Sequence, residues 1–192
     1  MESFVSLVYA LFSFISTILM GKGKYISFVF GLIATLLYSF LAFKNDLWGS
    51  LCLSLFYYLP IESLSLYKWF KNTNSETKSI YKTNLKTKTF LLYITLAIFL
   101  SLILSYILFV KKDALPLLDG FITIFSILAA YLTLIRVIEQ WIVWTVANIL
   151  TFSMWVKLIF QGSNSIPVAI LWGMYVILGI KFYFDWKREI NK

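Results

Sequence analysis

Apolar residues run through most of the chain, and short polar clusters divide them into seven stretches of about 20 residues. A helix needs about 20 mainly apolar residues to cross the hydrocarbon layer of a membrane, and every backbone polar group must be bonded within it. The pattern therefore predicts an all-α protein with seven transmembrane helices. The expected ranges are 3–20, 25–43, 47–67, 89–110, 115–135, 138–160 and 166–186.

One extended polar segment, WFKNTNSETKSIYKTNLKTK, follows the third predicted helix. The helices on either side of it resemble each other in layout. With an offset of 114 residues, three positions fall on one another: Phe30 on Trp144, Ala34 on Asn148 and Tyr38 on Phe152. After a three-residue insertion, YKWFK at 67–71 falls on FDWKR at 184–188.

This layout predicts a parallel repeat in which three helices, one connecting helix and three further helices form a single membrane domain. We take 1–70 as the first repeat, 71–114 as the loop plus the connecting helix, and 115–192 as the second repeat. A chance resemblance among apolar helices is the alternative. Small transporters with such repeats hold their substrate near the bilayer midplane, between the halves.

Composition supports a membrane protein, because 60% of the residues are hydrophobic and 14% are charged, against about 45–50% and about 25% in soluble domains. Seven crossings place the termini on opposite sides, and Lys and Arg gather on the cytoplasmic side. A cytoplasmic C-terminus puts 13 basic residues inside and four outside, the outer ones being Lys44, Lys111, Lys112 and Lys157. We therefore expect the N-terminus outside, and we interpret the net charge of +8 as a topology signal beside anionic lipid rather than as nucleic-acid binding.

Several kinds of chemistry are excluded by what the chain lacks. With Cys52 as the single cysteine and no histidine, thiolate or imidazole metal clusters and Ser-His-Asp catalysis are ruled out. No phosphate-binding glycine loop is present, so direct use of ATP is not expected. We expect no metal, no cofactor and no cleaved signal peptide, since Gly21 to Lys24 (GKGK) follow the first apolar stretch.

A polar stripe crosses the sixth predicted helix in EQWIVWTVANILTFSMW. Spacings of three or four residues place on one face Gln140, Trp144, Asn148, Thr151 and Trp155, with Trp141 at its flank. An unsatisfied amide is costly in lipid, so this face should point into the bundle. It suits a flat, hydrogen-bonding and cationic ligand, since indole faces attract cations. The alternatives are a helix-to-helix hydrogen bond of Asn148, about 0.6 kcal/mol on average, and interfacial positions for the tryptophans.

The third predicted helix offers further candidates for the substrate site. They are Ser54, Tyr57, Tyr58 and Glu62, to which the repeat adds Phe30 and Tyr38. Pro60 should kink this helix. Glu62 is an ionisable group within a span and so a functional candidate, with a lysine partner at the helix end as the competing account. Gating or helix-end roles are expected for Asp119, in a helix first turn, and for Arg136 and Glu139 as a local ion pair.

The motif W-x-x-W-x-x-x-N, here Trp141, Trp144 and Asn148, follows Glu139, Gln140 and the upstream LLDGFITIFSILAAYL. This motif resembles that of the PnuC family of bacterial vitamin transporters. The segment YYLPIES in the third predicted helix adds to the resemblance. The resemblance implies a fold like the SWEET sugar transporters with seven full spans, often a trimer, in the bacterial inner membrane. It also implies substrate contacts by the three motif residues and by Gln140.

The resemblance further implies facilitated diffusion of nicotinamide riboside, which a cytoplasmic kinase traps by phosphorylation. Ala34 and Ser54 depart from the pattern of some relatives, which leaves thiamine, or another flat vitamin or nucleoside, as an alternative cargo. A proton-coupled carrier stays open through Glu62. Glu62, Asp119 and Glu139 are expected at different depths, which argues against an intramembrane enzyme. A structural or assembly protein would have no reason for the polar stripe.

Overall fold

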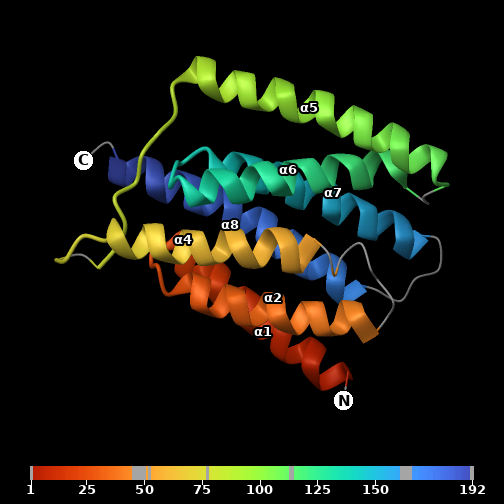
Figure 1. Ribbon diagram of the computed structural model, residues 1–192, viewed down its shortest axis with the longest axis horizontal. Coiled ribbons are helices and arrows are strands. Elements are labelled where there is room, and N and C mark those ends of the chain that lie inside the picture. Colours follow the sequence, from red (N-terminus) through yellow and green to blue (C-terminus); the bar gives the residue numbers. More distant parts are fainter. Residues whose placement is uncertain are drawn as a thin grey trace. The chain divides into compact units, whose positions relative to one another are not determined.

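The computed structural model describes residues 2–44, 51, 53–76, 78–112, 115–160 and 166–190, without the side chains of 2, 3, 42, 44, 158 and 166–168. Cys52 and the start of the third predicted helix lie outside this part of the chain. The regular secondary structure of the described residues is helical, with two isolated β-bridges. The helices are α1 (Glu2–Gly21), α2 (Ser27–Lys44), η1 (Ser54–Tyr58), α4 (Leu59–Lys71), α5 (Thr87–Val110), α6 (Pro116–Leu134), α7 (Gln140–Phe160) and α8 (Ile166–Ile190) (Figure 1).

These helices match the predicted ranges to within a few residues, with η1 and α4 together forming the third. Among the described residues, four segments are long and apolar enough to cross a membrane: Phe4–Gly21, Thr87–Val110, Pro116–Leu134 and Ala169–Ile190. Ser27–Leu41 is a shorter apolar segment of the same kind. The all-helical, multi-span character predicted from the sequence is confirmed.

The third helix contains a π-helical turn directly before its proline. The N–H of Leu59 bonds to the carbonyl of Ser54 five residues earlier, and Pro60 follows within the first turn of α4. Proline has no N–H to donate, and one wide turn lets the helix continue through such an interruption. The predicted effect of Pro60 therefore takes the form of a π-turn, and the side chain of Pro60 is exposed.

The chain divides into two compact units. The first comprises Met1–Lys82 and Thr133–Arg136, and the second Thr83–Leu132 and Val137–Lys192. In the first unit α1 lies against α2, and α2 against α4 (Figure 1). Trp69 of α4 is fully buried there, contacts the ring of Phe28 edge-on at 4.8 Å and donates its indole N–H to the carbonyl of Thr133 at 2.9 Å.

The polar segment after α4 is hydrogen-bonded to the first unit. Ile80 donates its N–H to the carbonyl of Gly23 at 3.0 Å, and Thr73 pairs with Ile80 in an antiparallel bridge. Gly23 has a φ of +68°, a conformation that glycine adopts without the usual steric penalty. The turn between α1 and α2 is thus hydrogen-bonded to the polar segment.

In the second unit α7 packs against α8 (Figure 1). Trp141 of α7 is 2% exposed and contacts the rings of Phe182 and Trp186 at 5.0 and 5.7 Å. Ile138 donates its N–H to the carbonyl of Thr83 at 2.9 Å, which joins the end of the polar segment to the start of α7. Aromatic packing near one end of α7 therefore fixes its rotation against α8.

Candidate functional site

The polar stripe of α7 is buried. Gln140 is fully buried, and Asn148 and Thr151 are 8% and 5% exposed, whereas Ile149 on the far side of the helix is 44% exposed. The stripe thus faces protein, as its amides require in lipid. Trp144 and Trp155 on the same stripe are half-buried.

Two buried polar side chains of this stripe, Gln140 and Thr151, differ in their hydrogen bonding. Neither polar atom of the Gln140 side chain has a hydrogen-bond partner among the described residues. The Thr151 hydroxyl, in contrast, donates to the carbonyl of Ala147 at 2.8 Å on its own helix. Buried polar groups nearly always have partners, so the amide of Gln140 is an exception within the fold.

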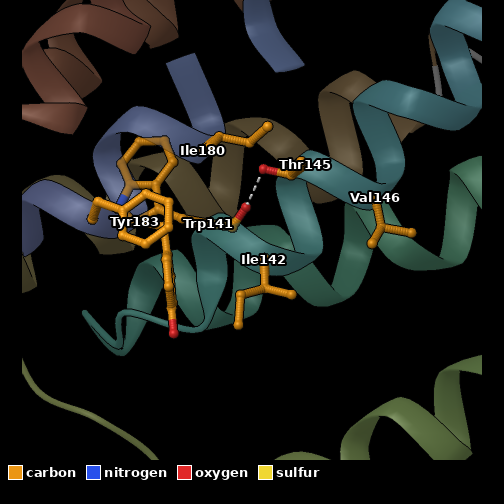
Figure 2. A pocket seen from close by; sticks show the side chains of 7 residues that line it. Trp141, Ile142, Thr145, Val146, Ile180 and Tyr183 are labelled. Atoms are coloured by element: carbon orange, nitrogen blue, oxygen red, sulfur yellow. Dashed lines mark hydrogen bonds between the residues drawn. The ribbon is translucent and has the colours of Figure 1, made fainter. Parts of the chain in front are cut away.

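A cavity of about 240 Å³ lies between α7 and α8 (Figure 2). Its lining residues are Trp141, Ile142, Thr145, Val146, Ile180, Tyr183 and Phe184. The lining is apolar, because the Thr145 hydroxyl points to the carbonyl of Trp141, to which it donates at 2.7 Å (Figure 2). Of the predicted substrate-site residues, this lining contains Trp141 alone. The polar residues Gln140, Asn148 and Thr151 are not part of it.

Polar side chains also meet inside the first unit. Thr35 of α2 donates its hydroxyl to Oε2 of Glu62 on α4 at 2.9 Å, and a Cβ added at Gly31 would lie 3.3 Å from Oε1 of Glu62. The hydroxyl oxygens of Ser39 and Ser54, both buried, lie 2.8 Å apart. The structure therefore brings Glu62 and Ser54 against α2.

Four aromatic candidates of the first unit contact other rings. Phe30 lies 5.7 Å from Phe12, and Tyr38 lies 5.6 Å from Tyr9, measured between ring centroids. Tyr57 and Tyr58 contact each other edge-on at 5.3 Å. The partners of Phe30 and Tyr38 belong to α1, so these two rings contribute to the packing of α1 on α2.

Glu139 and Arg136, predicted as a local ion pair, each form a hydrogen bond with the backbone of the polar segment. Oε2 of Glu139 accepts the backbone N–H of Leu85 at 3.1 Å, while Arg136 donates from Nη1 to the carbonyl of Tyr81 at 3.4 Å. Burial lowers the pKa of the Arg136 guanidinium, which still stays charged at neutral pH. Arg136 has a φ of +64°, in the left-handed region of the backbone.

Asp119 lies in the first turn of α6 and is half-buried, where a negative charge favours the positive end of the helix dipole. No group of three potential metal-ligating side chains occurs in the described part of the chain.

Sequence reasoning missed the residues that face Glu62 and Ser54 on α2. Gly31, Thr35 and Ser39 follow one another at intervals of four residues and so share one face of the helix. A stripe of small and hydroxyl-bearing residues is typical of close helix packing in membranes. The four-residue spacing of these residues is the sequence feature that indicates this packing face.

A multi-pass helical protein whose buried face carries amides and indoles fits the class of small-molecule transporters. The family model described as "Nicotinamide mononucleotide transporter" matches residues 3–188, and the chain belongs to this family. The predicted resemblance to the PnuC family is confirmed by the relatives.

Two relatives cover the whole chain. The nicotinamide riboside transporter PnuC of Neisseria mucosa is 29% identical over 196 residues, which are 100% of this chain and 74% of the relative. The protein of the same name from Haemophilus influenzae is 22% identical, with 100% of this chain and 82% of the relative covered. The crystal structure of the vitamin B3 transporter PnuC superposes with a TM-score of 0.80 and 28% identity, over 98% of this chain and 83% of that one.

Proposed function

We propose that the protein carries nicotinamide riboside across the bacterial inner membrane. The observation that carries this proposal is the pair of buried amides, Gln140 and Asn148, on the same helix face as Trp144, with the amide of Gln140 lacking a hydrogen-bond partner among the described residues. The amides suit the hydrogen-bonding edges of this cargo, and the indole of Trp144 suits its flat cationic ring. The names of the two relatives support the same substrate.

The riboside is favoured over the mononucleotide, although the family description names the latter. Phosphate groups are usually bound by Arg or Lys. The buried polar side chains of the described residues are Ser27, Ser39, Ser54, Ser65, Ser101, Ser105, Thr133, Gln140, Asn148 and Thr151, none of them basic. An uncharged ribose hydroxyl suits such surroundings better than a phosphate dianion.

The proposed mechanism is facilitated diffusion. Neither a nucleotide loop nor a set of carboxylates for an ion site is present in the sequence. Net uptake then requires that the cargo be consumed inside, and phosphorylation by a cytoplasmic kinase would trap it as an anion that the buried residues do not favour. We also propose a homotrimer, with the N-terminus outside and the C-terminus in the cytoplasm.

We further propose the parallel repeat of three, one and three helices, and one pair of close contacts supports it. The offsets of 114 and 117 residues place Gly31 on Thr145 and Glu62 on Gly179. In the first unit Gly31 lies against Glu62, and in the second unit Gly179 lies against Thr145. In the first unit the glycine lies on α2 and the larger residue on α4, whereas in the second unit the larger residue lies on α7 and the glycine on α8. The fully buried Trp69 and Trp186 also correspond.

The proposed cargo is tested by replacing Trp144 with alanine in protein reconstituted into liposomes. We expect uptake and binding of labelled nicotinamide riboside to weaken by about tenfold or more, since stacking of a base on an aromatic side chain is worth about 1–3 kcal/mol. Ile149→Ala on the exposed side of α7 is the matched control and should leave uptake unchanged.

Thiamine and nicotinamide mononucleotide, titrated in parallel, separate the candidate cargoes. Normal affinity of Trp144→Ala for the riboside, in protein that melts at the wild-type temperature, would contradict the assignment of the stripe. Saturable binding of thiamine but not of the riboside would identify thiamine as the cargo and leave the assignment of the α7 stripe as the binding face unchanged.

A further inference from the structure

Glu62 is a carboxylate placed well inside the first unit. Its hydrogen-bond donor, Thr35, is the ninth of the 18 residues of α2. At about 1.5 Å per residue, the contact lies close to the middle of that helix rather than at its end. An acidic side chain at such depth in a membrane protein is expensive and is usually functional.

No basic side chain among the described residues offsets this carboxylate. The described ion pairs join Asp185 to Lys181 and to Arg188 on α8. On the packed elements α1 carries no Lys or Arg, α2 carries only the terminal Lys44, and the nearest basic residue of α4, Lys68, is six positions further along. The lysine partner considered from the sequence is therefore not found in the described part of the chain.

One oxygen of the carboxylate is hydrogen-bonded, and the other packs against α2 at Gly31. Oε2 accepts the hydroxyl of Thr35 at 2.9 Å, which fixes the orientation of the group. Oε1 points towards Gly31, where even a Cβ would lie only 3.3 Å away, and Ser16 of α1 borders the same position. The hydroxyl of Ser16 donates instead to the carbonyl of Ser27 at 2.9 Å, so it does not neutralise Glu62.

We propose that Glu62 selects the cargo by charge: its carboxylate attracts a heteroaromatic cation, such as an N-substituted pyridinium, during passage through the protein. This proposal rests on the proposed function and adds the property that decides between chemically similar cargoes. A carboxylate without a basic partner discriminates strongly, because a cation compensates its charge whereas an uncharged or anionic molecule leaves that charge uncompensated.

The internal repeat supplies a second argument. The position equivalent to Glu62 in the second unit is Gly179, and the buried polar residues of α7 in that unit are amide and hydroxyl groups. This position therefore carries a carboxylate in the first unit and none in the second. One carboxylate at this position matches a cargo with a single positive charge.

Two forms of one molecule test the proposal. Nicotinamide riboside carries a pyridinium charge, and its reduced dihydropyridine form has the same ribose and carboxamide but no charge. We expect Glu62→Gln to lower the affinity for the cationic form by about tenfold or more and to change that for the neutral form by no more than about twofold, as the loss of one charge contact implies. Glutamine keeps an oxygen that accepts the Thr35 hydroxyl.

Three further variants complete the experiment. Glu76→Gln removes an exposed carboxylate of the polar segment and should change neither affinity. Glu62→Asp keeps the charge and should keep the preference for the cation. If Glu62→Gln does not fold, Gly31→Ala tests the same site, because its methyl group would lie 3.3 Å from Oε1 and should weaken binding of the cation alone.

Equal losses for both forms in Glu62→Gln would overturn the proposal and leave Glu62 with a structural role. Unchanged affinities combined with loss of a response to an imposed pH gradient would also overturn it, in favour of proton coupling. Both results leave uptake by the wild type intact. Failure of the folded wild type to bind either form would instead refute the proposed cargo.

Discussion

Two buried tryptophans differ in what their indole N–H groups contact. Trp69 is fully buried and donates to the carbonyl of Thr133 at 2.9 Å. Trp141 is 2% exposed, and its indole N–H has no partner among the described residues. The indole N–H of Trp69 is thus satisfied within the fold, and that of Trp141 is not satisfied by the described residues.

Replacing each tryptophan with phenylalanine should separate these roles. Both changes remove similar volumes, but Trp69→Phe also leaves the buried carbonyl of Thr133 without its donor, which costs about 1–3 kcal/mol. We therefore expect a clearly lower thermal unfolding midpoint for Trp69→Phe than for Trp141→Phe in detergent-solubilised protein. Equal midpoints for the two variants would show that the hydrogen bond does not contribute.

Individual site residues were predictable where one helix carries the whole pattern. The burial of Gln140 and Asn148 follows from spacings of three and four residues and from the cost of an exposed amide in lipid. The contact of Thr35 with Glu62 joins residues 27 positions apart. It depends on how α2 and α4 rotate about their axes, which no pattern within one helix determines.

At the scale of elements, α6 approaches α5 closely at Gly120 in the second unit. A Cβ added at Gly120 of α6 would lie 2.8 Å from the backbone nitrogen of Ser105 and 3.0 Å from the carbonyl oxygen of Ser101. Backbone atoms cannot move aside as a flexible side chain can. Small residues at such crossings let two membrane helices pack closely.

Gly120→Ala should therefore destabilise the protein by about 1–3 kcal/mol, the usual cost of overpacking. Gly173→Ala is the matched control, because its Cβ would lie 3.6 Å from the ring of Phe152, an ordinary contact distance. Thermal unfolding followed by tryptophan fluorescence measures both variants. A lower midpoint for Gly173→Ala than for Gly120→Ala would contradict this account of the crossing.

Helix positions were easier to predict from the sequence than helix irregularities. The expected range 89–110 compares with Thr87–Val110 for α5, and 138–160 with Gln140–Phe160 for α7. Lipid thickness fixes these lengths. Pro60 indicated an interruption, but the π-turn at Ser54–Tyr58 was not foreseen, because a missing donor is compatible with either a kink or a wider turn.

At the scale of the whole molecule, the polar segment shows the limit of pattern reasoning. Its composition predicts exposure to water, which Lys78 and Tyr81 confirm. The bonds from Ile80 to Gly23 and from Ile138 to Thr83 were not predicted. They are isolated backbone contacts without a periodic sequence signal, and they give a loop of polar residues a defined path.

The orientation in the membrane is the remaining prediction for the whole molecule, and it depends on the distribution of Lys and Arg. In a Cys52→Ser background, the chain has no cysteine, so one introduced cysteine reports one position. Ser75 in the polar segment and Lys111 after α5 are both exposed. Neither replacement weakens the charge bias, because Ser75 is neutral and Lys111 belongs to the smaller outer set.

We expect a membrane-impermeant maleimide to label Lys111→Cys in intact cells and Ser75→Cys only after the membrane is permeabilised. Labelling of both variants in detergent is the control for reactivity. Because α5 separates the two positions and is long and apolar enough to span the bilayer, one of them should be protected in intact cells. Protection of Lys111→Cys with labelling of Ser75→Cys would reverse the proposed topology, and with it the side from which the charge of Glu62 would first meet the cargo.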